Sequence, residues 1–420
     1  MIARERRDVG PVHLLALGLN GIVGVGIFFA PADIAARAPG AGTAIIALTA
    51  LALVPVALAF ATLGRRFDED GGPVVYARAA FGPLSAFVVG WIAYVSAISS
   101  TAAVIVGLTS AVGPAAGLGA TAQQVAATAL AATLALLCSA GLRLSAWTWT
   151  TLTALKLVPL CVLALVFVVA PGARAIPAGI ASGGSWPAAA LIATFTYQGF
   201  EIVPVLAGRA RRPAFSVPFA TLGSLALAAV LYVVLQAACA WTLPDLAHSA
   251  APLVDTAAVL GGAGLAALVG AGTSLSALGI AFGMMAATPF YLAALGRVDG
   301  LGMGLPLVDD RGVPRRALLA TWALVTVLIQ IGGRAELFAL SSIAVLTQYL
   351  VTAAALAALA LRRERRLGAR HVAIAVPAAL LSLCLAAGAT YVEARVAAFA
   401  LVAGLVLRGA LKRRGTTAAA

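Results

Sequence analysis

Long apolar segments, separated by short polar connections, occupy most of the chain. Reading hydrophobic against polar positions gives twelve such segments, most of them near the ~20 residues that a helix needs to cross a bilayer. They cover residues 11–36, 42–63, 83–111, 122–141, 145–170, 187–207, 217–242, 258–292, 315–332, 335–361, 371–390 and 393–410. The pattern predicts an all-α polytopic membrane protein with about twelve transmembrane helices, without an extended soluble domain.

The composition supports this interpretation. Of the 420 residues, 62% are hydrophobic and only 10% are charged, and the mean hydropathy is +1.04. These values exclude the soluble globular classes. The net charge of +13 would suit a nucleic-acid partner, but nearly all Lys and Arg residues lie in the short connections between spans, so we expect no nucleic acid to bind. The segment before the first span is short and basic, and we expect an uncleaved first helix rather than a signal peptide.

The basic residues alternate between the two sides of the predicted membrane. With the N-terminus in the cytoplasm, the inside connections and termini hold 23 Lys and Arg residues and the outside connections hold 4. This asymmetry predicts a multi-pass protein of the cytoplasmic (inner) membrane with both termini in the cytoplasm. The arginine clusters then set the orientation and contact the headgroups of membrane lipids.

The first span contains a run that is a poor continuous helix. Residues 18–31 carry glycine at positions 18, 21, 24 and 26, together with Asn20 and a closing Pro31. Each interior glycine costs about 1 kcal/mol relative to alanine, and a membrane span tolerates unwound backbone only where protein or a water-filled cavity satisfies it. The run therefore predicts a broken helix at a binding site. Close packing of another helix on the small residues is the alternative explanation.

The sixth span contains a second break. In residues 194–204 the apolar sequence is interrupted by Gln198, Gly199, Glu201 and Pro204. Five spans separate the starts of the two broken spans, so the second unit enters the membrane from the opposite side, as an inverted repeat of five helices requires. We therefore expect one membrane domain, with repeats at 11–170 and 187–361 and two further helices within 371–410.

The two breaks offer complementary backbone groups. Unwound backbone over residues 23–26 can present N–H groups to a carboxylate, aided by the positive end of a half-helix. Carbonyl groups over residues 195–198 can accept hydrogen bonds from an ammonium group. A zwitterionic amino acid satisfies both.

Two ionisable residues lie deep within spans, where a charge marks a candidate functional site. Lys156 falls near the middle of the fifth span, and Glu201 lies in the second break. Each is a candidate for proton coupling. Lys156 could instead be a fixed cation that fills an ion site, or it could extend to the membrane surface. Glu201 could instead be a buried acid with local hydrogen-bond partners. Cys138, Cys161, Cys239 and Cys384 form no CxxC pair and the three histidines are scattered, so we expect no metal site and no enzyme.

Several short motifs, in this order, resemble the amino acid–polyamine–organocation (APC) superfamily of transporters. They are Gly21-Ile22-Val23-Gly24-Val25-Gly26-Ile27-Phe28 with Pro31, Gly71-Gly72-Pro73-Val74-Val75-Tyr76, Phe81-Gly82-Pro83, Gly90-Trp91, Gly199-Phe200-Glu201, Arg211-Arg212-Pro213 with Pro218, Ala287-Thr288-Pro289, Gly304-Leu305-Pro306 and Gly312-Val313-Pro314. The resemblance covers residues 10–360. It implies a five-plus-five inverted repeat with two added helices, and alternating access around a central site.

The resemblance also implies roles for individual residues. The substrate carboxylate would face Gly24, Val25 and Gly26, and its amino group would face Phe195, Thr196 and Gln198. Ile22, Val23 and Phe200 complete the candidate substrate site. Trp91 and Tyr94, together with Phe200, are candidate gates, with core packing as the alternative. A lysine placed like Lys156 is similar to that of proton-coupled members, where it takes the position of a sodium ion, so we expect no sodium dependence.

The sequence departs from the superfamily pattern at three positions. Val25 lacks the hydroxyl group that several members have, Phe290 stands where a basic residue is expected, and Gln198 is polar where many members are apolar.

We expect a secondary active transporter that moves a neutral amino acid by proton symport, with no cofactor beyond the proton gradient. An amino acid/amine exchanger on the same fold is the main alternative, and a non-transporting nutrient sensor is a remote one.

Overall fold

The chain folds into a bundle of helices in a computed structural model that describes residues 9–24, 26–67, 71–113, 116–140, 146–169, 184–299, 307, 309 and 313–417. The helices are α1 (Pro11–Ile22), α2 (Gly26–Arg37), α3 (Gly42–Gly64), α4 (Pro73–Phe81), α5 (Pro83–Val112), α6 (Ala120–Ser139), α7 (Ala146–Val169), α8 (Trp186–Tyr197), the 3-10 helix η2 (Phe200–Arg209), α9 (Pro213–Thr242), η3 (Leu246–His248), α10 (Pro252–Asp299), α11 (Arg315–Ile331), α12 (Arg334–Leu361), η4 (Glu364–Arg366), α13 (Ala369–Ala386) and α14 (Tyr391–Thr417). Among these residues the only β-type pairing is an isolated bridge between Val9 and Ala210.

Helices coincide with all twelve apolar segments predicted from the sequence. Seven of the described helices are long and apolar enough to cross a membrane, and the bent pair of α1 and α2 together makes an eighth candidate. The all-helical, multi-pass membrane architecture is therefore confirmed. The total of twelve spans and the division into inverted repeats stay predictions.

Two local features differ from the sequence prediction. The short helix α4 was not expected. It starts at Pro73 after Gly72, whose φ is 47°, and ends at Gly82, whose φ is 89°. Proline at the first helical position and glycine beyond the last one are typical helix boundaries. The helix α10 is longer than the predicted span 258–292, and it contains a kink at Gly262, where φ is 70°.

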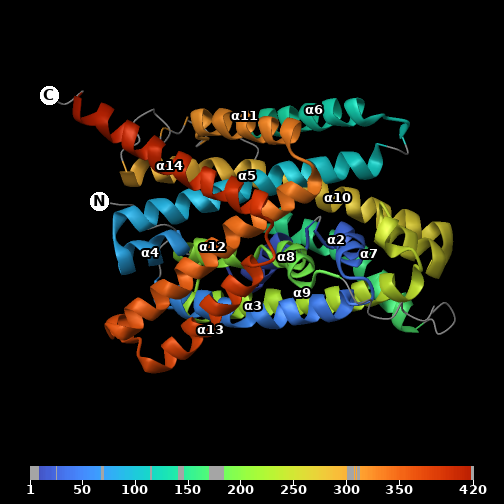
Figure 1. The fold of residues 1–420 in the computed structure, drawn as a ribbon, viewed down its shortest axis with the longest axis horizontal. Helices are drawn as coiled ribbons and strands as arrows, with labels where there is room; N and C mark the ends of the chain where they lie inside the picture. The colour runs from blue at the N-terminus through green and yellow to red at the C-terminus, as the bar shows by residue number, and fades with distance from the viewer. Residues whose placement is uncertain are drawn as a thin grey trace.

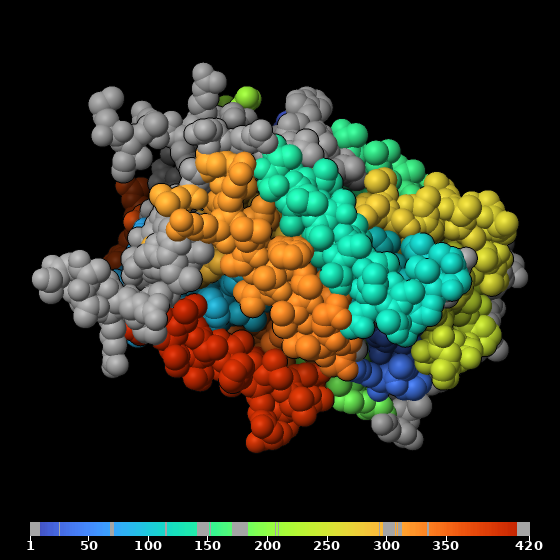
Figure 2. Space-filling model, turned by 90° about the horizontal axis from the view of Figure 1, so that it is seen from above, coloured from blue at the N-terminus to red at the C-terminus, as the bar shows by residue number. Residues whose placement is uncertain are grey.

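The bundle is layered around the broken helices. The long helices α5 and α10 lie side by side, and so do α3 and α9 on the other side of the bundle, while α12 crosses the layers (Figure 1). α11 and α6 cover α5 and α10, and Figure 2 shows these two outer helices next to each other, with α14 beside them. The short helices α1, α2, α8 and η2 lie between the layers, so the core encloses both interruptions.

The basic connections gather at one end of the bundle. Arg66, after α3, hydrogen-bonds to the Arg365 backbone between α12 and α13, and Arg362 bonds to the Ala80 backbone in α4. The backbone of Arg211, before α9, bonds to that of Val9, before α1. These contacts join four of the segments that the charge pattern assigned to the cytoplasm in two pairs. The Gly71 N–H, which donates to the Val205 carbonyl in η2, connects one pair with the other.

Glycine permits the closest approach between the two broken helices. A Cβ atom at Gly21 would lie 3.0 Å from both Cα and O of Gly199, and a Cβ atom at Gly26 would lie 3.0 Å from Cα of Thr196. Real Cβ atoms rarely come this close to backbone atoms. The first and second breaks are therefore packed backbone to backbone.

We predict that Gly21→Ala destabilises the protein by about 1–3 kcal/mol, the usual range for overpacking, because the backbone at Gly199 cannot yield. The matched control is Gly279→Ala in α10, whose Cβ atom would meet nothing within 4 Å. That control should be as stable as the original protein or slightly more stable, because alanine favours a helix. Thermal unfolding of the purified protein in detergent measures both. Equal melting temperatures for the two variants would contradict the close packing.

Candidate functional site

The first break separates α1 from α2. α1 ends at Ile22, α2 begins at Gly26, and the two helices are bent by 40°. The end of a helix leaves carbonyl groups without partners within the helix, and the start of the next leaves N–H groups without them. In apolar surroundings these groups need other partners, because an unsatisfied buried group costs about 1–3 kcal/mol.

Side chains from three other helices satisfy the carbonyl groups at the end of α1. The Lys156 ammonium group, from α7, donates to the carbonyl oxygen of Asn20 at 2.8 Å and also to that of Val23. The Tyr232 hydroxyl, from α9, donates to the Ile22 carbonyl at 2.8 Å. Ser276, from α10, donates to the Val23 carbonyl at 3.4 Å. The first break is thus anchored to α7, α9 and α10.

Lys156 is buried, with 2% of its surface exposed. It does not extend to the membrane surface, so this alternative is excluded by the structure. Its ammonium group lies among carbonyl oxygens at the C-terminal end of a half-helix, the kind of place where transporters coordinate a monovalent cation. When it is protonated, the Lys156 side chain provides the positive charge there without a bound ion.

The second break lies between α8 and η2. Gln198 is extended, and Gly199 has a φ of 132°, which favours glycine. The Glu201 carboxylate accepts a hydrogen bond from the Gly199 N–H at 2.8 Å and another from the Tyr349 hydroxyl, in α12, at 2.9 Å. Glu201 is therefore an acid with local hydrogen-bond partners that also fix the backbone of the break.

A cluster of small polar side chains adjoins the second break. The Ser341 hydroxyl donates to the Gln198 side-chain oxygen at 2.9 Å, and it lies 2.6 Å from the Ser100 hydroxyl and 3.1 Å from that of Ser96. The Gln198 amide donates to Ser342 at 3.4 Å. Sequence analysis missed these serines. The available signals were the spacing of four between Ser96 and Ser100 and the adjacent pair in α12, both within apolar spans.

The aromatic candidates occupy different places. Phe195 stacks on Phe338 with ring centroids 4.0 Å apart. Phe200 is fully buried, 5.9 Å from the Phe60 ring and 5.3 Å from the Tyr349 ring. Phe200 therefore belongs to a packed aromatic cluster with Phe60 and Tyr349, next to the second break.

The other two gate candidates, Trp91 and Tyr94, make their hydrogen bonds away from the breaks. The Trp91 indole donates to the Ala400 carbonyl, in α14, at 2.7 Å. The Tyr94 hydroxyl lies 3.2 Å from that of Thr321, in α11. Their role as gates stays a prediction.

Of the remaining predicted substrate residues, Ile22, Val23, Gly24 and Gly26 lie at the first break, and Thr196 at the end of α8 lies against Gly26. Val25 lies outside the described residues. Within the described part of the chain, no group of three or more His, Cys, Asp or Glu side chains could hold a metal ion.

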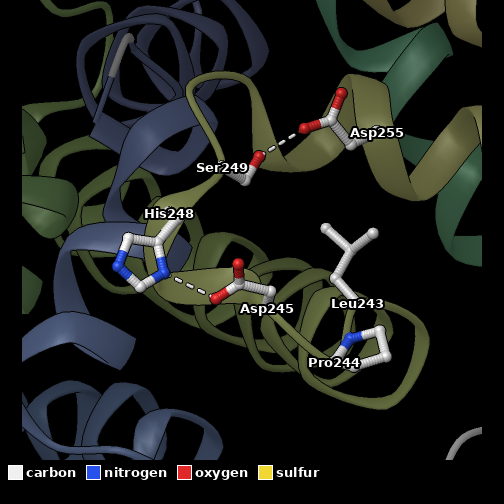
Figure 3. Close-up of a pocket in the computed structure, with 6 residues that line it drawn as sticks. All are labelled: Leu243, Pro244, Asp245, His248, Ser249 and Asp255. Carbon is white, nitrogen blue, oxygen red and sulfur yellow. Dashed lines mark hydrogen bonds and ion pairs between the residues drawn. The ribbon is translucent and has the colours of Figure 1, made fainter.

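A surface hollow of about 260 Å³ lies elsewhere, where α9 connects to α10 (Figure 3). Asp245 and His248 pair there at 2.6 Å, and Ser249 donates to Asp255. The side chains of His248 and Asp245 are 82% and 80% exposed, so their contact contributes little to stability. None of the residues that line the hollow belongs to either break, and the two buried breaks are the stronger candidate for a substrate site.

Comparison with known proteins assigns the family. The amino acid permease family model matches residues 9–404. The chain belongs to the amino acid permease family. The permease is 31% identical over 416 residues to an uncharacterized transporter of Mycobacterium tuberculosis, an alignment that covers 94% of this chain and 91% of that protein.

Two further relatives carry more specific names. A branched-chain amino acid permease of Bacillus subtilis is 27% identical over 264 residues, covering 57% of this chain and 56% of the relative. An arginine/ornithine antiporter of Pseudomonas aeruginosa is 36% identical over 160 residues, covering 36% and 33%. The resemblance to the APC superfamily is thereby confirmed, and the permease is a transporter of amino acids and not an enzyme.

We predict that Lys156→Met destabilises the permease by about 1–3 kcal/mol, because it leaves the Asn20 carbonyl buried without its side-chain donor and the Val23 carbonyl with only the 3.4 Å hydrogen bond from Ser276. The matched control is Leu155→Met, since Leu155 is adjacent in α7 but 52% exposed. Thermal unfolding gives the stability, and hydrogen exchange of backbone amides should accelerate around residues 19–27 in Lys156→Met only. An unchanged exchange rate there would contradict the anchoring role.

Proposed function

We propose that the permease binds an amino acid between its two broken helices and carries it across the cytoplasmic membrane by alternating access. The observation that carries the proposal is the direct packing of one break on the other, with Gly26 against Thr196 and Gly21 against Gly199. The start of α2 supplies N–H groups and the positive end of a helix dipole for a carboxylate. The end of α8 supplies carbonyl groups for an ammonium group. Both half-sites then hold one zwitterion.

The proposal includes a neutral side chain on the substrate. The polar groups beside the second break are the Gln198 amide and the serine hydroxyls, none of which carries a charge. Glu201 already accepts hydrogen bonds from Gly199 and Tyr349. A cationic substrate side chain would have to displace those bonds. The name of the Bacillus subtilis branched-chain amino acid permease supports the same choice.

The proposal also includes proton coupling, with Lys156 and Glu201 as the titratable groups. Both groups bond directly to the backbone of a break, so a change of protonation at either would alter the geometry of that break. Because the Lys156 ammonium group occupies the carbonyl cluster at the end of α1, the proposed cycle needs no sodium ion. The fold proposed for this cycle has twelve spans, an inverted repeat and both termini in the cytoplasm.

We predict that purified permease in liposomes accumulates radiolabelled branched-chain amino acids when the outside is made more acidic than the inside, without sodium and without internal substrate. The controls are liposomes without protein and permease liposomes treated with a protonophore. Uptake that requires internal substrate and ignores the protonophore would instead establish an exchanger, the alternative that the name of the Pseudomonas aeruginosa antiporter favours. Ligand-induced stabilisation with no movement of substrate would establish a sensor and reject transport.

We predict that Glu201→Gln removes the rise in uptake rate that external acidification produces, while substrate still stabilises the protein. Glutamine keeps the size of the side chain and an oxygen for the Gly199 N–H, but it cannot ionise. The matched control is Tyr349→Phe, which removes a hydrogen-bond partner of the carboxylate and keeps the carboxylate itself. That control should retain the pH response. A Glu201→Gln profile that superimposes on the original one would exclude Glu201 from coupling.

A further inference from the structure

The turn between α12 and α13 has an unusual backbone. Arg363, Arg365 and Arg366 have φ values of 57°, 49° and 59°, and they are the only non-glycine residues with positive φ in the described part of the chain. The left-handed conformation costs an L-residue with a Cβ atom roughly 1–2 kcal/mol. Three such residues in one short turn, all of them arginines, need a compensating interaction.

This turn is tied to the end of α3 by a reciprocal pair of hydrogen bonds. The Arg66 guanidinium donates to the Arg365 carbonyl at 2.7 Å, and the Arg365 guanidinium donates to the Arg66 carbonyl at 3.0 Å. The Arg365 guanidinium also lies over the Phe67 ring, 3.9 Å from its centroid. Two cationic side chains from segments about 300 residues apart are therefore held close to each other in fixed positions.

The pair lies within a larger group of positive charges, which we call the arginine cluster: Arg65, Arg66, Arg362, Arg363, Arg365, Arg366 and Arg370. Desolvation, and then repulsion by Arg65, Arg370 and Arg366, lowers the pKa of Arg66 below its ordinary value. Among the described residues, the acid recorded against this cluster is Glu364, which lies 3.9 Å from Arg362.

Sequence counting shows that the cluster is not neutralised. Asp68, Glu69 and Asp70 follow Phe67 in the chain but lie outside the described residues. If the charges of these three acids and of Glu364 are all subtracted from those of the seven arginines, three positive charges remain.

Orientation in the membrane does not by itself explain this geometry. The asymmetry that sets topology depends on how many Lys and Arg residues lie near the ends of the spans. It requires neither left-handed backbone nor guanidinium groups locked to opposite carbonyls. Arg66 and Arg365 keep further N–H groups in the fork that matches two oxygens of one phosphate. These N–H groups are arranged to donate several hydrogen bonds to one bound oxyanion.

We propose that the arginine cluster binds the phosphate group of an anionic membrane lipid, with Arg66, Arg365 and Arg366 as its main ligands. The location favours a lipid over a soluble anion. The cluster lies where α3 and α12 end and α13 begins, at the end of the bundle seen at the lower left of Figure 1. All three of these helices qualify as membrane spans, so their shared end lies at the depth of the headgroups.

A phosphate at this position would connect α3 with the α12–α13 turn. The residues that follow α3 also contact the second broken helix, because the Gly71 N–H donates to the Val205 carbonyl in η2 at 2.9 Å. The lipid would therefore lie next to the connection that supports η2, and its loss should loosen this end of the bundle.

The test uses full-length permease in a neutral detergent, with dioleoylphosphatidylglycerol and dioleoylphosphatidylcholine as probes. Native mass spectrometry should show retained phosphatidylglycerol, and its addition should raise the melting temperature, whereas phosphatidylcholine should do neither. Arg66→Gln/Arg365→Gln should weaken phosphatidylglycerol binding at least fivefold. The charge-matched control is Arg211→Gln/Arg212→Gln, which removes two exposed arginines from the same end of the bundle and should bind like the original protein.

One further variant and two comparisons distinguish the proposal from its alternatives. Arg366→Gln leaves the reciprocal pair intact and should still weaken binding, which keeps the test valid if the double variant does not fold. Equal binding by the Arg66/Arg365 and Arg211/Arg212 variants would overturn the proposal in favour of diffuse attraction by total charge. Stabilisation by inorganic phosphate to the same extent as by phosphatidylglycerol would overturn the choice of a lipid in favour of a soluble anion.

Discussion

The buried hydrogen bonds between the Lys156 ammonium group and the end of α1 are the interaction on which the rest of the structure depends. A helix that stops within an apolar bundle exposes carbonyl groups that neither lipid nor hydrocarbon side chains can satisfy. Lys156 meets two of them, at Asn20 and Val23. The cation is stabilised by the carbonyl dipoles and the dipoles by the cation, so neither could be buried there alone.

The second break is held in a different way. Its acid, Glu201, lies two residues from the glycine whose N–H it binds, and Tyr349 in α12 completes the arrangement. The backbone of the first break is held by side chains from α7, α9 and α10. The second break is held by its own residue Glu201 and by Tyr349 from α12. The two halves of the proposed site are thus fixed to different helices. A relative movement of those helices would change the distance between the half-sites without disrupting either one, which is what alternating access requires.

The sequence was sufficient to predict the positions of both breaks, because glycine, proline and ionisable residues in apolar spans carry a large local free-energy cost. Lys156 was selected as a candidate for the same reason. Tyr232, Ser276 and Ser341 were not, because their roles depend on which face of a helix meets a break far away in the chain. Span counting gives depth in the membrane but not rotation about the helix axis. The same limit applies to Trp91, whose indole faces α14 in the structure.

The contact between Gly21 and Gly199 shows why depth and rotation both matter. Gly199 needs glycine for two independent reasons, its φ of 132° and the backbone of the first break directly beside it. Gly21 lies within the last turn of α1 and could adopt its own conformation with any side chain, so its requirement comes only from its neighbour. The contact between Gly21 and Gly199 involves backbone atoms only. No interlocked side chains therefore have to separate there before the two breaks move apart. Lys156 and Glu201 supply hydrogen bonds to the backbone of the first and the second break, respectively. The contact between Gly21 and Gly199 therefore needs no polar side chain of its own.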